Sequence, residues 1–381
     1  MFGLPPLTIW YEKYGPFLYF VKNNRFMAKN GDLHNAKKVK NDEFYTQLCD
    51  IEKEIAHYKE HFKDKIVLCN CDDPLESNFT KYFILNFHYL GLKKLICTFY
   101  DINGRTAYAF EYEGDDANGD GIINNDDIEF IRQSGACRTI LVDDEGFDLS
   151  KKDECWIKGV YGSGDFRSKN VIDYLKESDI VVTNPPFSLF REYVGQLIEY
   201  NKKFIIIGNG NAVTYKEIFP LIKENKIWVG NKSFSGGMDM LAGKNYDSNK
   251  CKHPKYDERG NLLINVMMCI WFTNIPHTKR NLPLTLYKTY SPEKYPKYEN
   301  YDAIEVSSVN NIPCDYNGVM GVPVTFLDKY CPTQFEIIGM AEDNGKGYSC
   351  GANWDGVNPH CVINGKNMYK RIFIQKIQNK E

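Results

Sequence analysis

The stretch Asp179–Arg191, DIVVTNPPFSLFR, decides the fold of this chain. It begins with Ile180–Thr183, an apolar and β-branched run that predicts a short buried strand. The motif Asn184–Phe187, NPPF, follows, and its two prolines end the strand because each removes an N–H donor and fixes φ. The Asn amide and the carbonyls of the first two motif residues can then converge at the carboxyl end of the strand, beside a phenylalanine ring. These acceptors suit a planar ligand that carries an NH2 group; a proline-rich turn with a buried phenylalanine is the alternative.

The segments on either side of this stretch predict a parallel sheet. Lys65–Asn70 (KIVLCN) and Lys93–Tyr100 (KKLICTFY) read as buried strands, and the segment between them has helical periodicity up to Gly91. Strand, helix and strand at this spacing form a βαβ unit. A helix over 188–200 and a strand over 203–208 continue the pattern, so we expect an α/β fold with a Rossmann-like sheet and helices on both faces.

Polar residues follow several of the predicted strands, where ligands bind in parallel sheets. Cys69–Asp73 follows the first strand, and Asp101 follows the second at a place suited to ribose hydroxyls. Farther along, the glycines of Gly162–Arg167 allow the backbone to approach a ligand closely. There Asp165 can accept a hydrogen bond from an adenine amine while Phe166 stacks on the ring; a glycine-rich turn before a helix is the alternative.

Composition places few limits on function. A chain of 381 residues with 43% hydrophobic and 25% charged residues is an ordinary folded protein with room for two domains. Its net charge of −3 gives no overall attraction to nucleic acid. The 12 cysteines lack metal-ligand spacing, which predicts reduced thiols and a cytoplasmic location. The first residues, interrupted by prolines, predict neither a signal peptide nor a membrane span.

The segment Asp116–Asp127 resembles the calcium loop of an EF-hand or dockerin repeat. Its expected metal ligands are side-chain oxygens, with a backbone carbonyl at one position: Asp116, Asn118, Asp120, Ile122 (carbonyl), Asn124 and Asp127. An acidic, glycine-rich solvent turn is the alternative. The loop lies within residues 104–156, which we expect to be an excursion inserted between strands of the sheet.

The rest of the chain divides into three regions. Residues 1–40 are rich in Lys and Arg and predict an N-terminal arm, residues 41–275 a larger domain, and residues 276–381 a smaller second domain. Four basic residues near the start of the last region are candidate phosphate contacts, with a solvated face as the alternative: Lys279, Arg280, Lys288 and Lys294.

Several segments together resemble the EcoRI-type adenine-specific DNA methyltransferase family. They are NDEFYTQ, IVLCNCDDP, GDFRS and DIVVTNPPFSLFREYV, and the likeness runs from about residue 41 to 275, with GVPVTFLDKYCPTQFEIIG near the C-terminus. The family pattern implies that Phe44, Tyr45 and Thr46 lie at the methionine end of S-adenosylmethionine. It implies also that Asp101 binds its ribose, that Asp165 and Phe166 bind its adenine, and that Asp72 contacts it. The loop CNCDDP departs from the usual acid-Pro-x-x-Gly pattern, which puts Asp72 in doubt.

The resemblance implies transfer of a methyl group to adenine N6 in double-stranded DNA, with the base flipped out of the helix. It implies also that residues 41–275 are the catalytic domain and residues 276–381 the target-recognition region. The catalytic set is then Asn184, Pro185, Pro186 and Phe187, and Phe234 is a further candidate for the second face of the base, or a core residue. A restriction endonuclease of the same specificity would act on the same DNA without direct contact. Methylation of cytosine N4 or of a protein glutamine amide stays open, as does a non-catalytic nucleotide-binding protein.

Overall fold

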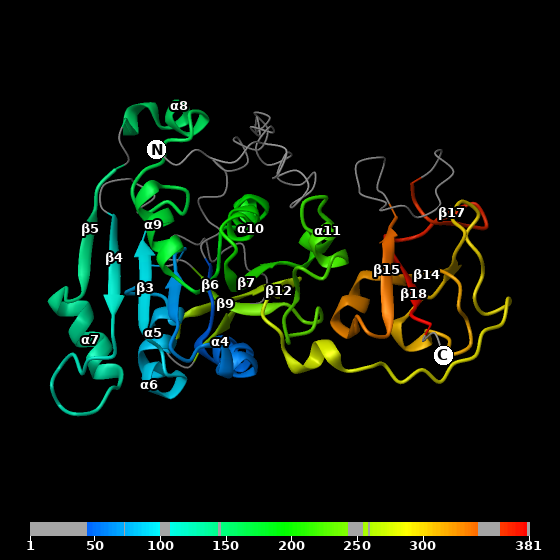
Figure 1. Cartoon of the computed structure of the whole chain (residues 1–381), viewed down its shortest axis with the longest axis horizontal. Coiled ribbons are helices and arrows are strands. Elements are labelled where there is room, and N and C mark those ends of the chain that lie inside the picture. The colour runs from blue at the N-terminus through cyan, green and yellow to red at the C-terminus, as the bar shows by residue number, and fades with distance from the viewer. Residues whose placement is uncertain are drawn as a thin grey trace, which may run out of the picture.

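The computed structural model describes residues 44–71, 73–99, 107–143, 146–242, 254–257, 260–341 and 359–378, so the predicted arm lies outside them. Its centre is an eight-stranded sheet in the order β5-β4-β3-β2-β6-β7-β12-β8 (Figure 1). The strands are β2 (Ile66–Cys69), β3 (Lys94–Phe99), β4 (Ala107–Tyr112), β5 (Arg138–Leu141), β6 (Ile180–Thr183), β7 (Lys203–Asn209), β8 (Trp228–Val229) and β12 (Cys269–Thr273).

The four central strands are parallel. β2 pairs in parallel with both β3 and β6, and β6 pairs in parallel with β7. The chain runs outward from β2 through β3 and, on the other side, from β6 through β7, so the direction of winding reverses between β2 and β6. Such a reversal opens a crevice for ligands at the carboxyl ends of the two strands. The predicted α/β sheet is confirmed, as a mixed sheet whose outer strands are antiparallel.

Helices cover both faces of this sheet. On one face lie α4 (Leu48–Ile55), η1 (Ala56–His61), α5 (Asn78–Leu85) and α6 (Phe87–Leu90); on the other lie α9 (Lys169–Glu177), α10 (Phe190–Glu199) and α11 (Phe219–Lys223). Alternate strand residues serve the two faces, since Val67 packs with the first group and Leu68 with the second. Because both faces of the central strands are buried, these strands must be apolar at nearly every position, and their sequences are.

Three segments with regular sequence patterns are interrupted in the structure. The helical stretch that begins with α4 changes to a 3₁₀-helix at Ala56, and the helix expected before Gly91 is broken at Asn86, whose side chain donates to the Tyr82 carbonyl. The strand-like stretch NVMMCIWFTN is divided by Met268, which has φ of 55°.

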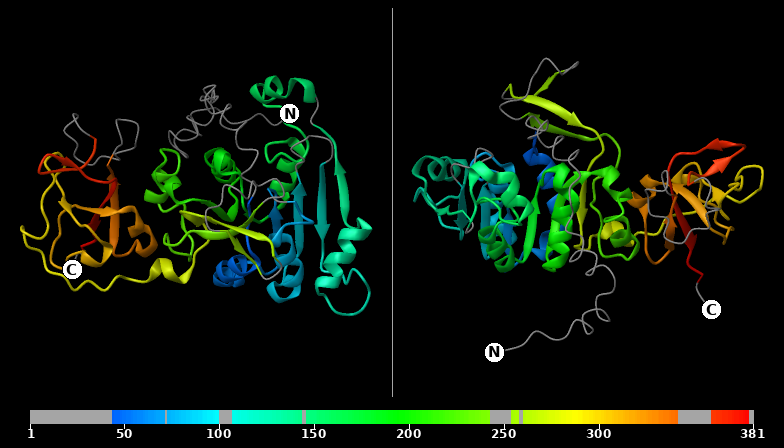
Figure 2. Two further views of the ribbon diagram at one scale, coloured as in Figure 1. Left: turned by 180° about the vertical axis from the view of Figure 1, so that it is seen from behind. Right: turned by 90° about the horizontal axis from the view of Figure 1, so that it is seen from above.

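The first residues of that stretch belong to β11 (Leu262–Val266) in a second sheet that projects from the body of the molecule (Figure 2). The order of this sheet is β1 (Phe44–Tyr45), β9 (Met238–Ala242), β11 and β10 (Lys255–Tyr256).

The segment expected to be an inserted excursion instead extends the central sheet. β4 pairs with β3 and β5 pairs with β4, both antiparallel, with α7 (Asn125–Ser134) between them. The interpretation as a pure excursion was wrong because the periodicity of β4 was masked by its neighbouring glycine-rich loop. η2 (Leu149–Lys151) and α8 (Lys152–Ile157) follow before α9.

The C-terminal part builds a third sheet at one end of the long axis (Figures 1 and 2). Its strands are β13 (Ile304–Glu305), β14 (Met320–Pro323), β18 (Arg371–Lys376) and β15 (Phe335–Met340), in that order. Their buried side chains share one apolar cluster with those of α10 and α11, so the core is continuous across this boundary. Among the described residues, no helix has both the length and the apolar character that crossing a bilayer requires.

Candidate functional site

The NPPF motif lies where the sequence predicts, at the carboxyl end of β6. Asn184 and Phe187 are half-buried, Pro185 is buried and Pro186 is exposed. The Pro186 carbonyl accepts a hydrogen bond from the backbone N–H of Leu189 at 2.9 Å, which starts η3 (Phe187–Leu189) and then α10. The strand-to-helix turn therefore places the motif beside the crevice between β2 and β6.

Asn70, directly after β2, faces the same crevice from the neighbouring strand. Its side chain is 2% exposed, and its Oδ1 accepts a hydrogen bond from the hydroxyl of Tyr193 in α10. Burial raises the pKa of Tyr193 well above its usual value, so this hydroxyl stays protonated and donates. The contact ties the end of β2 to the helix that follows the NPPF motif.

The loop Gly162–Phe166 packs against the end of β3. Gly164 has φ of +80°, and a Cβ added there would lie 2.1 Å from the carbonyl oxygen of Phe99. Asp165 and Phe166 are 6% and 5% exposed, and the Phe166 ring meets the Tyr193 ring edge to face with centroids 5.0 Å apart. The two predicted cofactor residues therefore lie next to Asn70 and α10, although the Phe166 ring is enclosed by protein.

The structure describes only some of the other predicted cofactor residues. Phe44 and Tyr45 form β1 (Phe44–Tyr45), paired with β9 (Met238–Ala242), and the Thr46 carbonyl accepts from Asn78 Nδ2 at 2.8 Å. This bond holds the FYT segment against the start of α5, just beyond the loop after β2. Asp72 and Asp101 lie outside the described residues.

Three buried polar atoms around these loops have no hydrogen-bond partner among the described residues. They are Thr46 Oγ1, Asn70 Nδ2 and Ser163 Oγ. Buried polar groups are nearly always hydrogen-bonded, so such a group of atoms fits a polar ligand at the carboxyl edge of the sheet. A nucleoside-based cofactor with hydroxyl, amine and carboxylate groups meets that requirement.

Phe234, the candidate for the second face of the base, is a core residue. Its ring is 4% exposed and belongs to the buried cluster, and a Cβ added to Gly210 would lie 3.2 Å from it. The alternative given for Phe234 therefore holds in this structure.

In the loop expected to bind calcium, the carboxylates accept hydrogen bonds from the loop's own backbone N–H groups. Asp116 accepts from the N–H groups of Gly119 and Gly121, and Asp127 accepts from those of Ala117 and Asn124 at 2.9 and 2.8 Å. Asp127 is fully buried as part of the capping box that starts α7. In the part of the chain that the structure describes, no group of three His, Cys, Asp or Glu side chains is arranged to hold a metal, so the calcium prediction is not supported. The loop lies beyond β4, whose last residue pairs with the start of β3, and thus at the opposite edge of the sheet from the NPPF motif.

This geometry makes a prediction about metal removal. We expect chelation by EDTA to leave the Tm unchanged, whereas Asp127→Ala lowers the free energy of unfolding by about 1–2 kcal/mol through loss of the cap. Asp126→Ala, at an exposed position in the same helical turn, is the matched control and should have a smaller effect. Thermal unfolding with EDTA or with added calcium measures this, and a calcium-dependent rise in Tm would contradict it.

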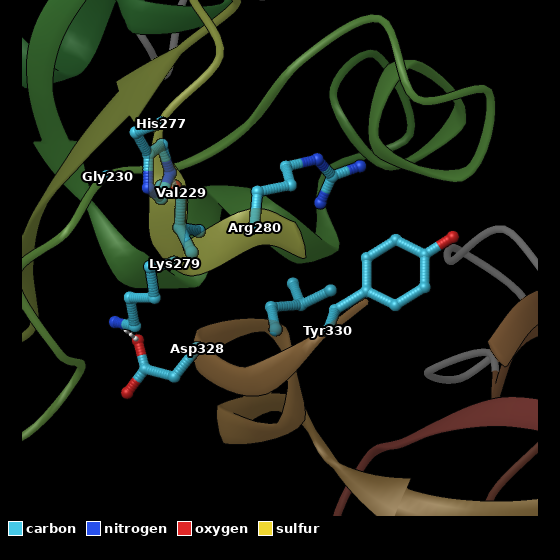
Figure 3. A pocket seen from close by; sticks show the side chains of 8 residues that line it. Val229, Gly230, His277, Lys279, Arg280, Asp328 and Tyr330 are labelled. Carbon is cyan, nitrogen blue, oxygen red and sulfur yellow. Dashed lines mark hydrogen bonds and ion pairs between the residues drawn. The ribbon is translucent and has the colours of Figure 1, made fainter. Parts of the chain in front are cut away.

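A small pocket lies between the central sheet and the C-terminal part (Figure 3). Lys279 forms an ion pair with Asp328 there at 3.8 Å, and the guanidinium of Arg280 lies over the rings of Trp228 and Tyr330. Arg280 is 8% exposed, so it is not available as the predicted phosphate contact. Lys288 and Lys294 are exposed. The pocket lies where the central sheet and the C-terminal part meet, and none of the residues that line it belongs to the NPPF motif.

His277, which lines this pocket, should make the free energy of unfolding depend on pH. It is 6% exposed with Nε2 3.1 Å from the Val229 carbonyl, and burial lowers its pKa from 6.5 to about 4. The unfolded chain therefore binds a proton that the folded protein does not, and stability falls as the pH drops from 6.5 toward 4, by up to roughly 3 kcal/mol. His277→Gln should flatten this slope, and His57→Gln, at an exposed position, should not. Urea unfolding between pH 4.5 and 7 measures it; equal slopes for wild type and His277→Gln would refute the assignment.

Some residues of the site are absent from the sequence-based prediction. Asn70 could have been found, because it directly follows a buried strand. Tyr193 and Glu192 could not, because helical periodicity marks them only as part of α10 and their partners are distant in sequence.

A parallel four-stranded core with an NPPF motif at its winding reversal and a glycine-rich acidic loop beside it is consistent with the methyltransferase class of α/β enzymes. The model of the family described as "Adenine-specific methyltransferase EcoRI" matches residues 32–377. The chain belongs to this family of adenine-specific methyltransferases.

Three curated relatives support the assignment. The Type II methyltransferase M.EcoRI of Escherichia coli is 46% identical over 351 residues, covering 91% of this chain and 97% of that protein. The Type II methyltransferases M.MpnI of Mycoplasma pneumoniae and M.MgeORF184P of Mycoplasma genitalium are each 36% identical, covering 91% of this chain and 98% of each relative. No solved structure matched the chain.

Proposed function

We propose that the chain transfers a methyl group from S-adenosylmethionine to N6 of an adenine in double-stranded DNA, within a restriction-modification system. One observation carries the proposal: the NPPF motif of a family of adenine-specific methyltransferases lies at the crevice between β2 and β6, next to a loop with buried, unsatisfied polar atoms. The relatives are named Type II methyltransferases, which supports the modification context. A restriction endonuclease of the same specificity would act on the same DNA without touching this protein.

Asn184 and Pro185 would hold the target amine. The lone pair of adenine N6 is delocalised into the ring, so the amine is a poor nucleophile. When Asn184 Oδ1 and the Pro185 carbonyl accept both N6 hydrogens, the nitrogen shifts toward sp³ and its developing positive charge is stabilised. No basic side chain is needed. Asn184 is half-buried as a residue, and its Oδ1 atom is buried at the end of β6.

Phe187 and Pro186 would shape the pocket for the base. Adenine cannot reach the motif while it is stacked in the duplex, so it must be flipped out. Phe187 packs on the apolar cluster of the first sheet face and keeps part of its ring accessible, so it can replace the lost stacking partner. Pro186 is exposed at the rim and fixes the backbone that presents the Pro185 carbonyl.

The cofactor would lie along the carboxyl ends of β2 and β3 and supply a methyl group activated on a sulfonium. We assign Phe44, Tyr45 and Thr46 to its methionine end, Asp101 to its ribose, and Asp165 with Phe166 to its adenine, with Asp72 as a further contact. Thr46 Oγ1, Asn70 Nδ2 and Ser163 Oγ are further donors or acceptors for it. Holding cofactor and amine in line supplies much of the rate.

Target recognition would fall to residues 276–381, with the arm over residues 1–40 as a further phosphate contact. The C-terminal sheet stands beside the central sheet and shares its core, so it can present a fixed surface to the DNA near the flipped base (Figure 2). Lys288 and Lys294 are the exposed cations of this region that were singled out from the sequence.

The test is to follow labelled S-adenosylmethionine in the presence of unmethylated duplex DNA. We expect the label in DNA, with amounts limited by the number of target sites, and with none in added protein extracts. Label in protein alone would favour a glutamine-amide methyltransferase, and cofactor binding without any transfer would favour a nucleotide-binding protein without catalysis. Either result contradicts the proposal.

A further inference from the structure

The guanidinium of Arg167 lies between the carboxylates of Asp165 and Glu192. Its Nε and Nη2 donate to the two oxygens of Asp165, each at 2.8 Å, in a bidentate pair. Its Nη1 donates to Glu192 Oε2 at 3.2 Å. The side chains of Arg167 and Asp165 are only 12% and 7% exposed, whereas that of Glu192 is 47% exposed. The pair with Asp165 is thus shielded from water, and the pair with Glu192 is its outer support.

Aromatic rings fix the plane of this guanidinium. Its carbon lies 4.4 Å from the centroid of the Tyr161 ring and 5.3 Å from that of Trp156. Burial alone lowers the pKa of Arg167, but the hydrogen bonds and charge of Asp165 more than offset this, and the pKa lies above its usual value. The planar fork matches a carboxylate in a way that a lysine ammonium cannot.

The helix that follows NPPF holds the same loop at three points. Glu192, Tyr193 and Gln196 lie on one side of α10; Glu192 binds Arg167, the Tyr193 ring packs on the Phe166 ring, and Gln196 Nε2 donates to the Phe166 carbonyl at 3.1 Å. α10 begins at Phe190, three residues after the motif ends. The acidic loop and the NPPF motif are therefore held by one rigid element.

Bidentate pairing leaves Asp165 able to accept further hydrogen bonds. Each carboxylate oxygen has two lone-pair sites, and the guanidinium occupies one on each. The backbone N–H of Arg167 takes the second site on Oδ1 at 2.9 Å, so the second site on Oδ2 is the one left for a ligand. A nearly buried carboxylate without a cation would lose much of its charge stabilisation and its orientation. Arg167 supplies both while leaving an acceptor position for an NH2 group.

We infer that Arg167 is a positioning residue for cofactor recognition: it holds the Asp165 carboxylate in the orientation that accepts the 6-amino group of the cofactor's adenine, and it anchors this acceptor through Glu192 to the helix that follows NPPF. This inference rests on the proposed function, because it takes S-adenosylmethionine as the ligand of the loop.

The test measures the Kd of two ligands by calorimetry on the full chain. They are S-adenosylhomocysteine and its analogue with hydrogen in place of the 6-amino group. Wild type should prefer the amine-bearing ligand by roughly tenfold to a hundredfold, the value of a charge-assisted hydrogen bond. Arg167→Lys, which keeps the charge and loses the fork, should reduce this preference to about threefold or less while the Kd of the analogue changes little. Arg191→Lys, on α10 next to Glu192 but with its guanidinium over the Tyr215 ring, is the matched control and should keep the preference.

Equal weakening of both ligands by Arg167→Lys, or an unchanged preference, would overturn the inference. If wild type binds neither ligand, the proposed function fails instead, so the two failures are distinct. Should Arg167→Lys not fold, Glu192→Gln tests the same chain of contacts at a half-exposed position. It should lower the preference about twofold to fivefold, as loss of an exposed ion pair predicts; a full wild-type preference would refute the link to α10.

Discussion

Asn184→Ala is expected to lower the rate of methyl transfer by roughly 10²–10³-fold while cofactor affinity stays within about threefold of wild type. In the proposed mechanism the side-chain oxygen of Asn184 acts on the target amine as it gains positive charge, whereas other loops are proposed to hold the cofactor. Asn184 is half-buried at the end of β6, so its removal leaves the strand and the buried Pro185 in place.

Single-turnover kinetics and calorimetry with S-adenosylhomocysteine separate the two effects. Ser188→Ala, at an exposed position in the same turn, is the control and should keep nearly full activity. If Asn184→Ala loses cofactor binding together with activity, then Asn184 supports the structure of the site and its proposed role is wrong.

Gly164→Ala should both destabilise the fold and remove cofactor binding. The residue has φ of +80°, and the added Cβ would lie 2.1 Å from the Phe99 carbonyl oxygen, which belongs to a strand and cannot move away cheaply. Left-handed strain and the displacement of the loop together should lower the free energy of unfolding by about 2–4 kcal/mol. The displaced loop carries Asp165, so cofactor affinity should fall with it.

Gly119→Ala provides the matched control. Gly119 has φ of +79°, but nothing lies within 4 Å of its added Cβ. It should show the backbone strain alone, about 1 kcal/mol, and leave cofactor affinity unchanged. Urea unfolding and calorimetry compare the two variants; equal losses of stability would mean that the contact with Phe99 has no importance.

The parallel core of the fold was predictable because its signals are local. Apolar runs at 65–70, 93–100, 180–183 and 203–208, separated by helical periodicity, define the parallel strands, and the two prolines after β6 fix the place of the motif. The edge strand β5 was missed because it is short and partly exposed, and its alternation is weak. Its neighbour β4 is longer and mostly buried, and it was missed because a glycine-rich loop follows it directly.

The contacts that complete the candidate site are not local, and the sequence could not supply them. Tyr193 and Asn70 are 123 residues apart, and Arg167 and Glu192 are 25 apart. In the sequence, Arg167 is only the residue after a candidate adenine contact. The calcium motif shows the opposite error: its spacing is local and complete, yet the same oxygens can bond to the loop's own N–H groups and cap a helix.

Identification of the methylated nucleoside tests the central claim most directly. Duplex DNA is treated with labelled S-adenosylmethionine and either the wild-type protein or Asn184→Ala. The DNA is then digested to nucleosides, which are separated and identified by mass spectrometry. The account predicts that the label is found in N6-methyl-2′-deoxyadenosine with wild type and is lost with the variant. Label in N4-methyl-2′-deoxycytidine, or transfer that survives in Asn184→Ala, would contradict it.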